Sequence, residues 1–465
     1  MGELAVHTTP IPGLLVFDLA VHGDARGWFK ENWQREKMLA LGLPDLEPVQ
    51  NNMSYNASRG ATRGLHAEPW DKLVSLASGR ILGAWVDLRE GPSFGATYWL
   101  DMGVDKAVYV PRGVANGYQA LADDTVYSYL VNDHWSQHAR DEYTYVNLAD
   151  ETVGVPWPIP LAEATVSDAD ARHPRLADVV PMKPRRTLIL GGAGQLGLAL
   201  QDVFGDADAL DADHLDLTDA AAVDAFDWSP YGTIVNAAAY TAVDRAETPE
   251  GRAACWAINV TAVGRLARVA REHRAVLVHV SSDYVFDGTR PVHPEDEPVS
   301  PLGVYGQTKA AADALVALVP RHYLIRTSWV IGEGQNFVRT MASLAERGVR
   351  PAVVDDQHGR LTFTADLAAA IAHLLGTGTP FGTYNVTCDG PVSTWYDIAR
   401  RVFALTGHDP DAVSPQSTAD YAAGKVVAPR PEHSTLALDK IKATGFVPPT
   451  TEDALAAYLA RGAVR

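Results

Sequence analysis

The hydrophobic pattern of this 465-residue chain changes between residues 178 and 187. Before that point, short apolar runs such as KLVSLASGRILGAWVDLREG, KAVYVPRG and TVYSYLVND are separated by Gly, Pro and Asp, and helical periodicity is nearly absent. After it, the apolar runs TLILGG, GTIVNAAA, AVLVHVSS, YLIRTS and PAVVDD alternate with alanine-rich stretches of helical period. The pattern predicts an all-β sandwich or barrel followed by an α/β part with a parallel sheet.

The segment between the two parts is VVPMKPRR, residues 179–186, in which two prolines and three basic residues are typical of a linker. We therefore expect a first domain at 1–178, a linker at 179–186 and a second domain at 187–465. The length of the chain agrees, because it exceeds what one core usually organises.

The composition excludes several classes of protein. A hydrophobic content of 47% is typical of a folded chain, and a net charge of −18 argues against a nucleic-acid-binding surface. The two cysteines fit a reducing compartment, the first residues lack the pattern of a secretion signal, and no apolar run approaches about 18 residues. We expect a cytoplasmic protein with no membrane or nucleic-acid partner.

Three glycines, Gly191, Gly194 and Gly197, lie after a predicted strand and at the start of a predicted helix. This spacing lets backbone amides meet a pyrophosphate, although a tight strand–helix turn is an alternative. Asp211 follows the second strand region, and no Arg or Lys occurs between Arg186 and Arg245. A carboxylate there suits the 2′-hydroxyl of NADH better than the 2′-phosphate of NADPH, and both cofactors stay open.

Tyr305 and Lys309 are four residues apart in VYGQTK, so a helix would place them on one face. The tyrosine is then either a proton donor whose pKa a cation lowers or part of an exposed surface pair.

The motifs GGAGQLG, NAAAYTAVDRAE, SSDYVFDG, VYGQTK, RTSWVIG and NFVRTM occur in this order, and residues 186–463 resemble the dTDP-4-dehydrorhamnose reductase family of extended short-chain dehydrogenases. The resemblance implies a Rossmann-type domain with a small C-terminal substrate-binding part, and reduction of a nucleotide-sugar ketone by NADH or NADPH. Tyr305 would protonate the carbonyl oxygen, Lys309 would lower its pKa and bind the nicotinamide ribose, and Ser282 would bind the substrate oxygen.

Further residues are implied by position in the same motifs. The cofactor would contact Gly191, Gly194, Gln195, Leu196, Gly197, Asp216, Leu217, Ala239, Tyr240, Thr241, Val280, Tyr305 and Lys309. The substrate would contact Thr241, Val243, Ser282, Asp283, Tyr284 and Trp329, of which Trp329 could equally be a core residue.

In the first part, ATRGLHAEPWDKLV places Arg63, His66 and Lys72 close together, and SDAD adds Asp170. A histidine oriented by a carboxylate is a general-base arrangement, and neighbouring cations suit a diphosphate or an enolate. A histidine without such partners is more often a core residue, which is the alternative here.

The motifs DARGWFKE, QNNMS, RGLH, VDLREGPSFG, VPRGVANGY, YLVNDHW, VPWPIP and VSDAD resemble the dTDP-4-dehydrorhamnose 3,5-epimerase family, which implies a cupin-like jelly roll. By this resemblance His66 removes the sugar's acidic protons and Asp170 orients it. Lys72 would stabilise the enolate, and Tyr129 would supply a proton from the opposite face. The nucleotide and sugar would be held by Arg26, Glu31, Gln50, Asn52 and Arg63.

Three departures from the family pattern occur. Asn116 replaces a histidine, Trp135 replaces a later tyrosine, and the loop between His66 and Lys72 is shorter than usual. The amide of Asn116 can still donate a hydrogen bond to an oxyanion. We therefore expect an active epimerase, with reaction at only one carbon left open.

The two activities share one ketone, which acidifies C3 and C5 and is itself reduced at C4. We expect conversion of dTDP-4-dehydro-6-deoxy-D-glucose to dTDP-L-rhamnose, and an exposed sheet that allows a homodimer. The histidines show no metal-ligand spacing, so no metal is expected. The alternatives are a reductase whose first part only binds nucleotide or dimerises, and a regulatory protein, against which the retained Ser282, Tyr305 and Lys309 argue.

Overall fold

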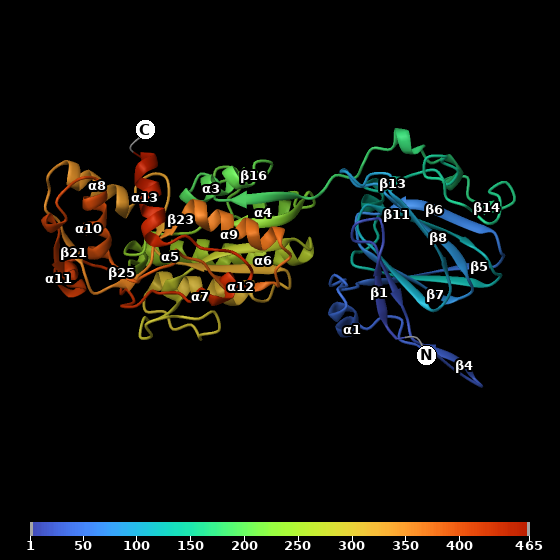
Figure 1. Ribbon diagram of the computed structural model, residues 1–465, viewed down its shortest axis with the longest axis horizontal. Helices are drawn as coiled ribbons and strands as arrows, with labels where there is room; N and C mark the ends of the chain where they lie inside the picture. Colours follow the sequence, from blue (N-terminus) through green and yellow to red (C-terminus); the bar gives the residue numbers. More distant parts are fainter. Residues whose placement is uncertain (1–2, 463–465) are drawn as a thin grey trace. The chain divides into compact units, whose positions relative to one another are not determined.

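The computed structural model describes residues 3–462, apart from the side chains of residues 137 and 138. The chain divides into two compact units between Pro184 and Arg185 (Figure 1). None of the helices within the described range combines the length and the apolar character that a membrane crossing requires.

The first unit consists mainly of two six-stranded sheets, in which every pair except one is antiparallel. The first sheet has the strand order β1 (Ala5–Thr8), β2 (Leu15–Asp18), β10 (Lys106–Val110), β7 (Lys72–Ser78), β12 (Thr125–Val131), β5 (Gln50–Asn56). The second has the order β13 (Thr144–Tyr145), β6 (Ala61–Ala67), β11 (Val114–Ala120), β8 (Ile81–Asp87), β9 (Thr97–Met102), with β14 (Thr165–Val166) parallel to β6.

The core of this unit lies between the two sheets. Val74 of β7 and Val108 of β10 belong to the same buried cluster as Trp85 of β8 and Tyr118 of β11. Because side chains alternate between the faces of a strand, each sheet contributes one apolar face to this core.

Outside the two sheets, β3 (Val21–Asp24) and β4 (Gly27–Lys30) form a separate hairpin, followed by α1 (Arg35–Ala40). Figure 1 shows β4 extending away from the sheets of its unit. Trp28 and Phe29 on this hairpin are 47% and 65% exposed. A short helix, α2 (Gln137–Asp141), follows β12.

The segment expected to be a linker at 179–186 is largely part of the two units. Val179 and Met182 are buried in a core cluster of the first unit, and the backbone of Met182 bonds with Leu88 and Glu90. Arg186 already belongs to β15. The apolar side chains at 179 and 182 outweigh the proline-rich composition, so the free stretch is shorter than the sequence indicated.

The second unit contains a six-stranded parallel sheet. Its order is β16 (Asp208–Leu210), β15 (Arg186–Leu190), β17 (Tyr231–Asn236), β18 (Val276–Ser282), β19 (His322–Thr327), β24 (Gly382–Asn385). The expected strand PAVVDD is not part of it, because β21 (Ala352–Val354) pairs with β26 (Ser414–Gln416).

Helices cover both faces of the parallel sheet. Leu188 and Leu277 pack in one cluster with α6 (Ala262–Glu272) and α7 (Val304–Val316), while Ile189 and Val278 pack in another with α3 (Gln195–Val203) and α9 (Thr364–Gly376). Neighbouring strand residues thus face opposite helix layers, which explains the continuous apolar runs of these strands. The second unit also contains the helices α4 (Ala220–Ala225), α5 (Pro249–Trp256) and α12 (Asp439–Ala443).

A third buried cluster lies in a smaller part of the second unit. It involves the helices α8 (Phe337–Glu346), α10 (Trp395–Leu405) and α13 (Thr451–Gly462). Short strand pairs and one short helix complete this part: β20 (Val330–Ile331) with β23 (Thr362–Phe363), β22 (His358–Gly359) with β25 (Ser393–Thr394), and α11 (Thr418–Ala422).

Candidate active sites

One pocket of the first unit, with a volume of about 180 Å³, gathers side chains from both sheets. Its lining includes four residues that the sequence predicted, which are Arg63, His66, Lys72 and Tyr129. The packing of the two sheets on each other explains the gathering, because Arg63 and His66 lie on β6 of one sheet while Lys72 and Tyr129 lie on β7 and β12 of the other.

His66 and Asp170 form a hydrogen-bonded pair. His66 Nε2 lies 2.9 Å from Asp170 Oδ1, and the amide of Gly64 lies 3.4 Å from Oδ2. Burial alone would raise the pKa of Asp170, but hydrogen bonds with His173 and His66 outweigh it and hold that pKa below its usual range. Asp170 is therefore an ionised carboxylate that orients the imidazole of His66.

His173 is a further member of this group, and no motif in the sequence pointed to it. Among the described residues, the ligand atoms of His66, Asp170 and His173 form the one group of metal-ligating type, all within 4.8 Å of one another. The sequence predicted no metal. We interpret the group as a base with its orienting acid, because 2.9 Å is a hydrogen-bond distance.

Lys72 is buried and held by two acceptors. Its Nζ lies 2.5 Å from Glu68 Oε2 and donates a hydrogen bond to Asn116 Oδ1. The Nδ2 of Asn116 donates in turn to Tyr127 Oη at 3.1 Å. The Asn116 amide thus holds Lys72 through its oxygen and uses one of its two N–H groups on Tyr127, which leaves the other N–H as a donor. The sequence analysis did not identify Glu68 as a partner of Lys72.

Tyr129 remains protonated in this pocket. Burial, followed by the negative charge of Glu68, raises the pKa of Tyr129 to about 12. A phenol that keeps its proton is suited to be an acid.

The expected nucleotide-binding residues fall into two groups. Gln50 and Asn52 lie on β5, where Gln50 Nε2 donates to Asn52 Oδ1 at 2.9 Å and Asn52 is paired with Tyr129. Neither these two residues nor Arg26 and Glu31 line the pocket of their own chain. Arg26 on the β3–β4 turn bonds to Asp24, and Glu31 lies 2.5 Å from Lys37.

In the second unit, the glycine-rich turn between β15 and α3 has no space for side chains. Gly191 has a φ of +82°, and a Cβ on Gly197 would approach Gly191 O to 2.1 Å. Helix α3 begins after Gly194, which has no side chain that could cap it, so amides of its first turn are available to a ligand.

Two buried polar atoms near this turn have no partner among the described residues, Gln195 Oε1 and Tyr240 Oη. The backbone of Tyr240 is fixed by Asn259, whose Oδ1 accepts from Tyr240 N at 2.8 Å and whose Nδ2 donates to Tyr240 O at 3.1 Å. Asn259 lies in a π-helical turn, Ala257–Thr261, which the sequence did not indicate. Unpaired buried groups beside a free helix N-terminus fit a dinucleotide.

Tyr305 and Lys309 both lie on α7, as the spacing predicted, but their electrostatics differ from the expectation. Burial and then the charge of Asp283 raise the pKa of Tyr305, while a hydrogen bond with Ser282 opposes the shift. Burial lowers the pKa of Lys309 to about 8. The ammonium of Lys309 donates to Val280 O at 2.6 Å. The net direction for Tyr305 is therefore upward, which keeps the phenol protonated.

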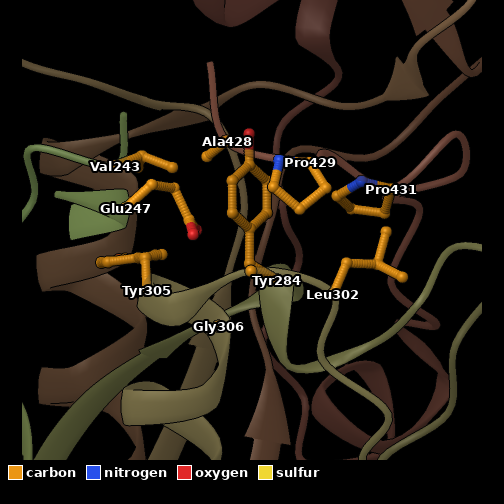
Figure 2. A pocket seen from close by; sticks show the side chains of 10 residues that line it. Val243, Glu247, Tyr284, Leu302, Tyr305, Gly306, Ala428, Pro429 and Pro431 are labelled. Atoms are coloured by element: carbon orange, nitrogen blue, oxygen red, sulfur yellow. The ribbon is translucent and has the colours of Figure 1, made fainter. Parts of the chain in front are cut away.

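A narrow pocket lies beside Tyr305. Figure 2 shows Tyr284, Tyr305 and Val243, three predicted residues, facing Glu247 and Pro429. Glu247 also accepts a hydrogen bond from Val304 N at 2.8 Å, which fixes the start of α7.

The other residues predicted to bind the substrate do not line this pocket. Ser282 Oγ donates to Asp283 Oδ1 at 2.8 Å, and burial raises the pKa of Asp283 to about 6. Thr241 is exposed. Trp329 stacks on Trp395 with centroids 3.9 Å apart and packs against the third core cluster.

The cofactor residues predicted by position differ in exposure. Leu196, Leu217, Ala239 and Val280 are partly buried. Asp216 is exposed and accepts from Thr218 N at 2.8 Å.

The two sites define a chain that joins a general-base pocket to a dinucleotide-type reductase site. A family model described as dTDP-4-dehydrorhamnose 3,5-epimerase matches residues 8–178, and one described as RmlD substrate binding domain matches residues 185–464. The chain belongs to both families and is a fusion of the two.

Individual relatives cover each half. Residues of the first half are 53% identical over 180 residues to a protein RmlC homolog of Streptococcus pyogenes, covering 38% of this chain and 90% of the relative. A probable dTDP-4,6-dihydroxy-2-methyloxan-3-one 4-ketoreductase of Streptomyces antibioticus is 41% identical over 273 residues, covering 57% of this chain and 90% of the relative. The crystal structure of a Bacillus anthracis dTDP-4-dehydrorhamnose reductase in complex with NADP is 32% identical, with a TM-score of 0.56, covering 60% of this chain and 99% of that one.

Replacement of Asn116 should weaken catalysis through Lys72. In Asn116→Ala, Lys72 loses one acceptor, and we expect exchange of solvent deuterium into a 4-keto sugar nucleotide to slow roughly 10- to 100-fold. Tyr127→Phe removes only the far end of the hydrogen-bond chain and should cost less. Equal exchange rates in Asn116→Ala and the unmodified protein would show that Lys72 does not need this amide.

Proposed function

We propose that the chain is a bifunctional sugar-nucleotide enzyme. It epimerises dTDP-4-dehydro-6-deoxy-D-glucose at C3 and C5, then reduces the C4 ketone with NADH or NADPH to give dTDP-L-rhamnose. The observation that carries the proposal is the presence, on one chain, of a carboxylate-oriented histidine beside a lysine and a protonated tyrosine, and of a second protonated tyrosine beside a dinucleotide-type turn. The first unit would be an epimerase domain of cupin-like jelly-roll type and the second a Rossmann-type reductase domain.

The epimerase chemistry follows from the pocket in the first unit. The protons at C3 and C5 are acidic because both carbons flank the ketone. The imidazole of His66 accepts such a proton, and the carboxylate of Asp170 stabilises the resulting imidazolium. The ammonium of Lys72 stabilises the enolate oxygen, and Tyr129 donates a proton to the opposite face of the carbon, which inverts it.

The reductase site fits a nicotinamide cofactor, because its glycine turn excludes side chains and Gln195 Oε1 and Tyr240 Oη lack partners. When bound, the cofactor supplies a hydride to C4 of the sugar. Tyr305 holds the proton that the carbonyl oxygen receives, and Ser282 holds that oxygen in place. The residues that would hold the cofactor are those predicted from the motifs, namely Gly191, Gly194, Gln195, Leu196, Gly197, Asp216, Leu217, Ala239, Tyr240, Thr241, Val280 and Lys309.

A cytoplasmic location forms part of the proposal. Cys255 and Cys388 are free and buried, and free thiols suit a reducing compartment.

The two activities can be separated on the full-length protein. Without NADH or NADPH, in D₂O, the protein should incorporate deuterium at C3 and C5 of the keto sugar, measured by NMR. Tyr305→Phe should keep this exchange and lose cofactor oxidation, whereas His66→Ala should lose exchange by a factor on the order of 10²–10⁴. A folded wild-type protein that exchanges at neither carbon would leave the first unit as a nucleotide-binding or dimerisation module, with the reductase alone active.

Cofactor choice should depend on Asp211. This residue follows β16, and a hydrogen bond with His214 lowers the pKa of its carboxyl, so it carries the charge that would repel a 2′-phosphate. In Asp211→Ala we expect the ratio of kcat/KM for NADPH to that for NADH to rise about 5- to 10-fold. Asp213→Ala removes an equal charge two residues away and should leave the ratio unchanged. The same rise in both variants would assign the effect to net charge.

A homodimer formed by the first unit is also proposed. The hairpin exposes Trp28 and Phe29, and the edge strand β5 exposes Met53 and Tyr55 at 67% and 60%. Exposed apolar side chains beside an unpaired sheet edge are typical of an interface. A second copy would cover them, and Arg26, which does not reach the pocket of its own chain, could then serve the partner's pocket.

Light scattering of the full-length protein tests the dimer. We expect twice the chain mass for the unmodified protein and a shift towards the monomer for a Trp28→Ser, Phe29→Ser variant, because apolar burial is lost. Val426→Ser, which alters an apolar residue exposed at 79% in the second unit, is the control. A monomeric unmodified protein would refute the dimer.

A further inference from the structure

One oxygen atom of Asp170, Oδ1, contacts two imidazoles. His66 Nε2 lies 2.9 Å and His173 Nε2 lies 3.3 Å from Asp170 Oδ1. The side chains of Asp170 and His173 are 10% and 13% exposed, so the contact between them is sheltered from water, whereas the side chain of His66 is 32% exposed. The proposed epimerase reaction uses only His66 and Asp170, which leaves the second imidazole without a role.

The ring of His173 is fixed by aromatic packing. It stacks on Tyr145 of β13, with centroids 4.5 Å apart and an interplanar angle of 17°. Both rings also make edge contacts with His66, at 5.3 Å from His173 and 5.4 Å from Tyr145. His173 is therefore held against the base by packing, independently of its contact with the carboxylate.

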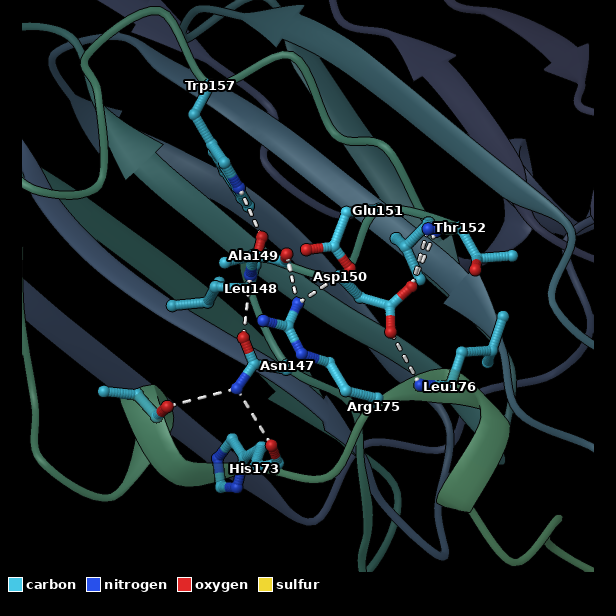
Figure 3. A network of polar contacts seen from close by, with 12 residues as sticks. Asn147, Leu148, Ala149, Asp150, Glu151, Thr152, Trp157, His173, Arg175 and Leu176 are labelled. Carbon is cyan, nitrogen blue, oxygen red and sulfur yellow. Dashed lines mark hydrogen bonds and ion pairs between the residues drawn. The ribbon is translucent and has the colours of Figure 1, made fainter.

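The backbone of His173 is fixed by Asn147, as Figure 3 shows. The Nδ2 of this buried amide donates to Ala171 O at 3.1 Å and to His173 O at 2.9 Å. The Oδ1 accepts from Ala149 N at 2.9 Å. One side chain thus ties the turn that contains Asp170 and His173 to the loop after β13.

The carboxylate of Asp150, also drawn in Figure 3, binds the other end of the segment that contains His173. Asp150 accepts hydrogen bonds from Thr152 N at 2.9 Å and from Leu176 N at 2.8 Å. Asn147 N also donates to Pro174 O at 2.9 Å, so residues 171–176 are bound to residues 147–152 at several places. Such repeated attachment preorganises the position from which His173 reaches Asp170.

We propose that His173 is a positioning residue of the epimerase that sets the basicity of His66 through their shared carboxylate, with Asn147 holding it in register. The inference rests on the proposed epimerase function of the first unit. Among the described residues, the groups that face Asp170 are His66 and the Gly64 amide from β6 and His173 from its own segment, with the phenol of Tyr145 packed across both rings.

The two imidazoles share one negative charge, that of Asp170. A carboxylate stabilises the protonated form of an imidazole that it contacts, which makes that imidazole a stronger base. A second N–H on the same oxygen takes part of this charge and so makes His66 a weaker base than it would be in a simple pair. Removal of that N–H should therefore move the acid limb of the exchange reaction to higher pH, since His66 must be neutral to accept a proton.

The test is the pH profile of deuterium exchange into the keto sugar by the full-length protein. His173→Phe keeps a ring on Tyr145 but has no N–H, and the midpoint of its acid limb should lie higher by on the order of 0.5–1 pH unit. His173→Gln offers an amide N–H in place of the imidazole, and its midpoint should stay near that of the unmodified protein. Identical midpoints in all three proteins, or equal rate losses in both variants with no shift, would overturn the inference.

Asn147→Ala and a measurement without substrate provide independent checks. Asn147→Ala should lower the exchange rate and broaden the profile, because the turn loses the side-chain hydrogen bonds to Ala171 O and His173 O. NMR titration of ¹³C-labelled histidines should show the His66 resonance responding to His173→Phe but not to His173→Gln. If His66 titrates alike in both variants, the inference fails, whereas absence of exchange in the unmodified protein would refute the proposed function alone.

Discussion

A buried carboxylate must find hydrogen-bond donors, and in the first unit this requirement connects segments far apart in the sequence. Asp170 is 7% exposed and lies 104 positions after His66, its partner on β6. An unpaired charge at that place would be strongly disfavoured. The turn after β14 must therefore lie against β6, and the pocket of the first unit depends on this contact for its base.

The second unit uses burial in a different way. The pKa of Tyr305 is raised and that of Lys309 is lowered, each because its charged form is removed from water. The same environment thus drives an acid and a base towards their neutral forms. Reduction of a ketone needs a phenol that still carries its proton. Burial, which raises the pKa of Tyr305, therefore suits the direction of the proposed reaction.

Local sequence patterns predicted much of this molecule. The glycine turn, the helix with Tyr305 and the strand-rich first part are encoded within short windows, and resemblance to two families added His66 with Asp170. Three contacts carried no such signal, which are those of Glu68 with Lys72, His173 with Asp170 and Asn259 with Tyr240. The first two join residues only three or four positions apart, but their local sequence does not show that both side chains turn towards the same pocket. Asn259 reaches Tyr240 from a π-helical turn 19 positions away.

Some expectations differed from the structure for a physical reason. PAVVDD is an apolar run typical of a central strand, yet tertiary packing pairs it with β26 in the smaller part of the unit. A linker was predicted at 179–186 because of its prolines, but the apolar side chains of Val179 and Met182 are buried in the core of the first unit. Arg26 was assigned to the pocket by its motif, but a motif does not show which pocket an extended hairpin reaches.

The amide at position 116 affects how the charge in the pocket of the first unit depends on pH. A histidine, the residue of the family pattern, can gain a proton near neutral pH, whereas an amide cannot. The chain of contacts from Lys72 through Asn116 to Tyr127 also has one polarity, because a lysine only donates and the amide has distinct ends. A fall in pH therefore leaves the charge of the side chain at position 116 constant, although this residue is paired with His66 on the neighbouring strand β6.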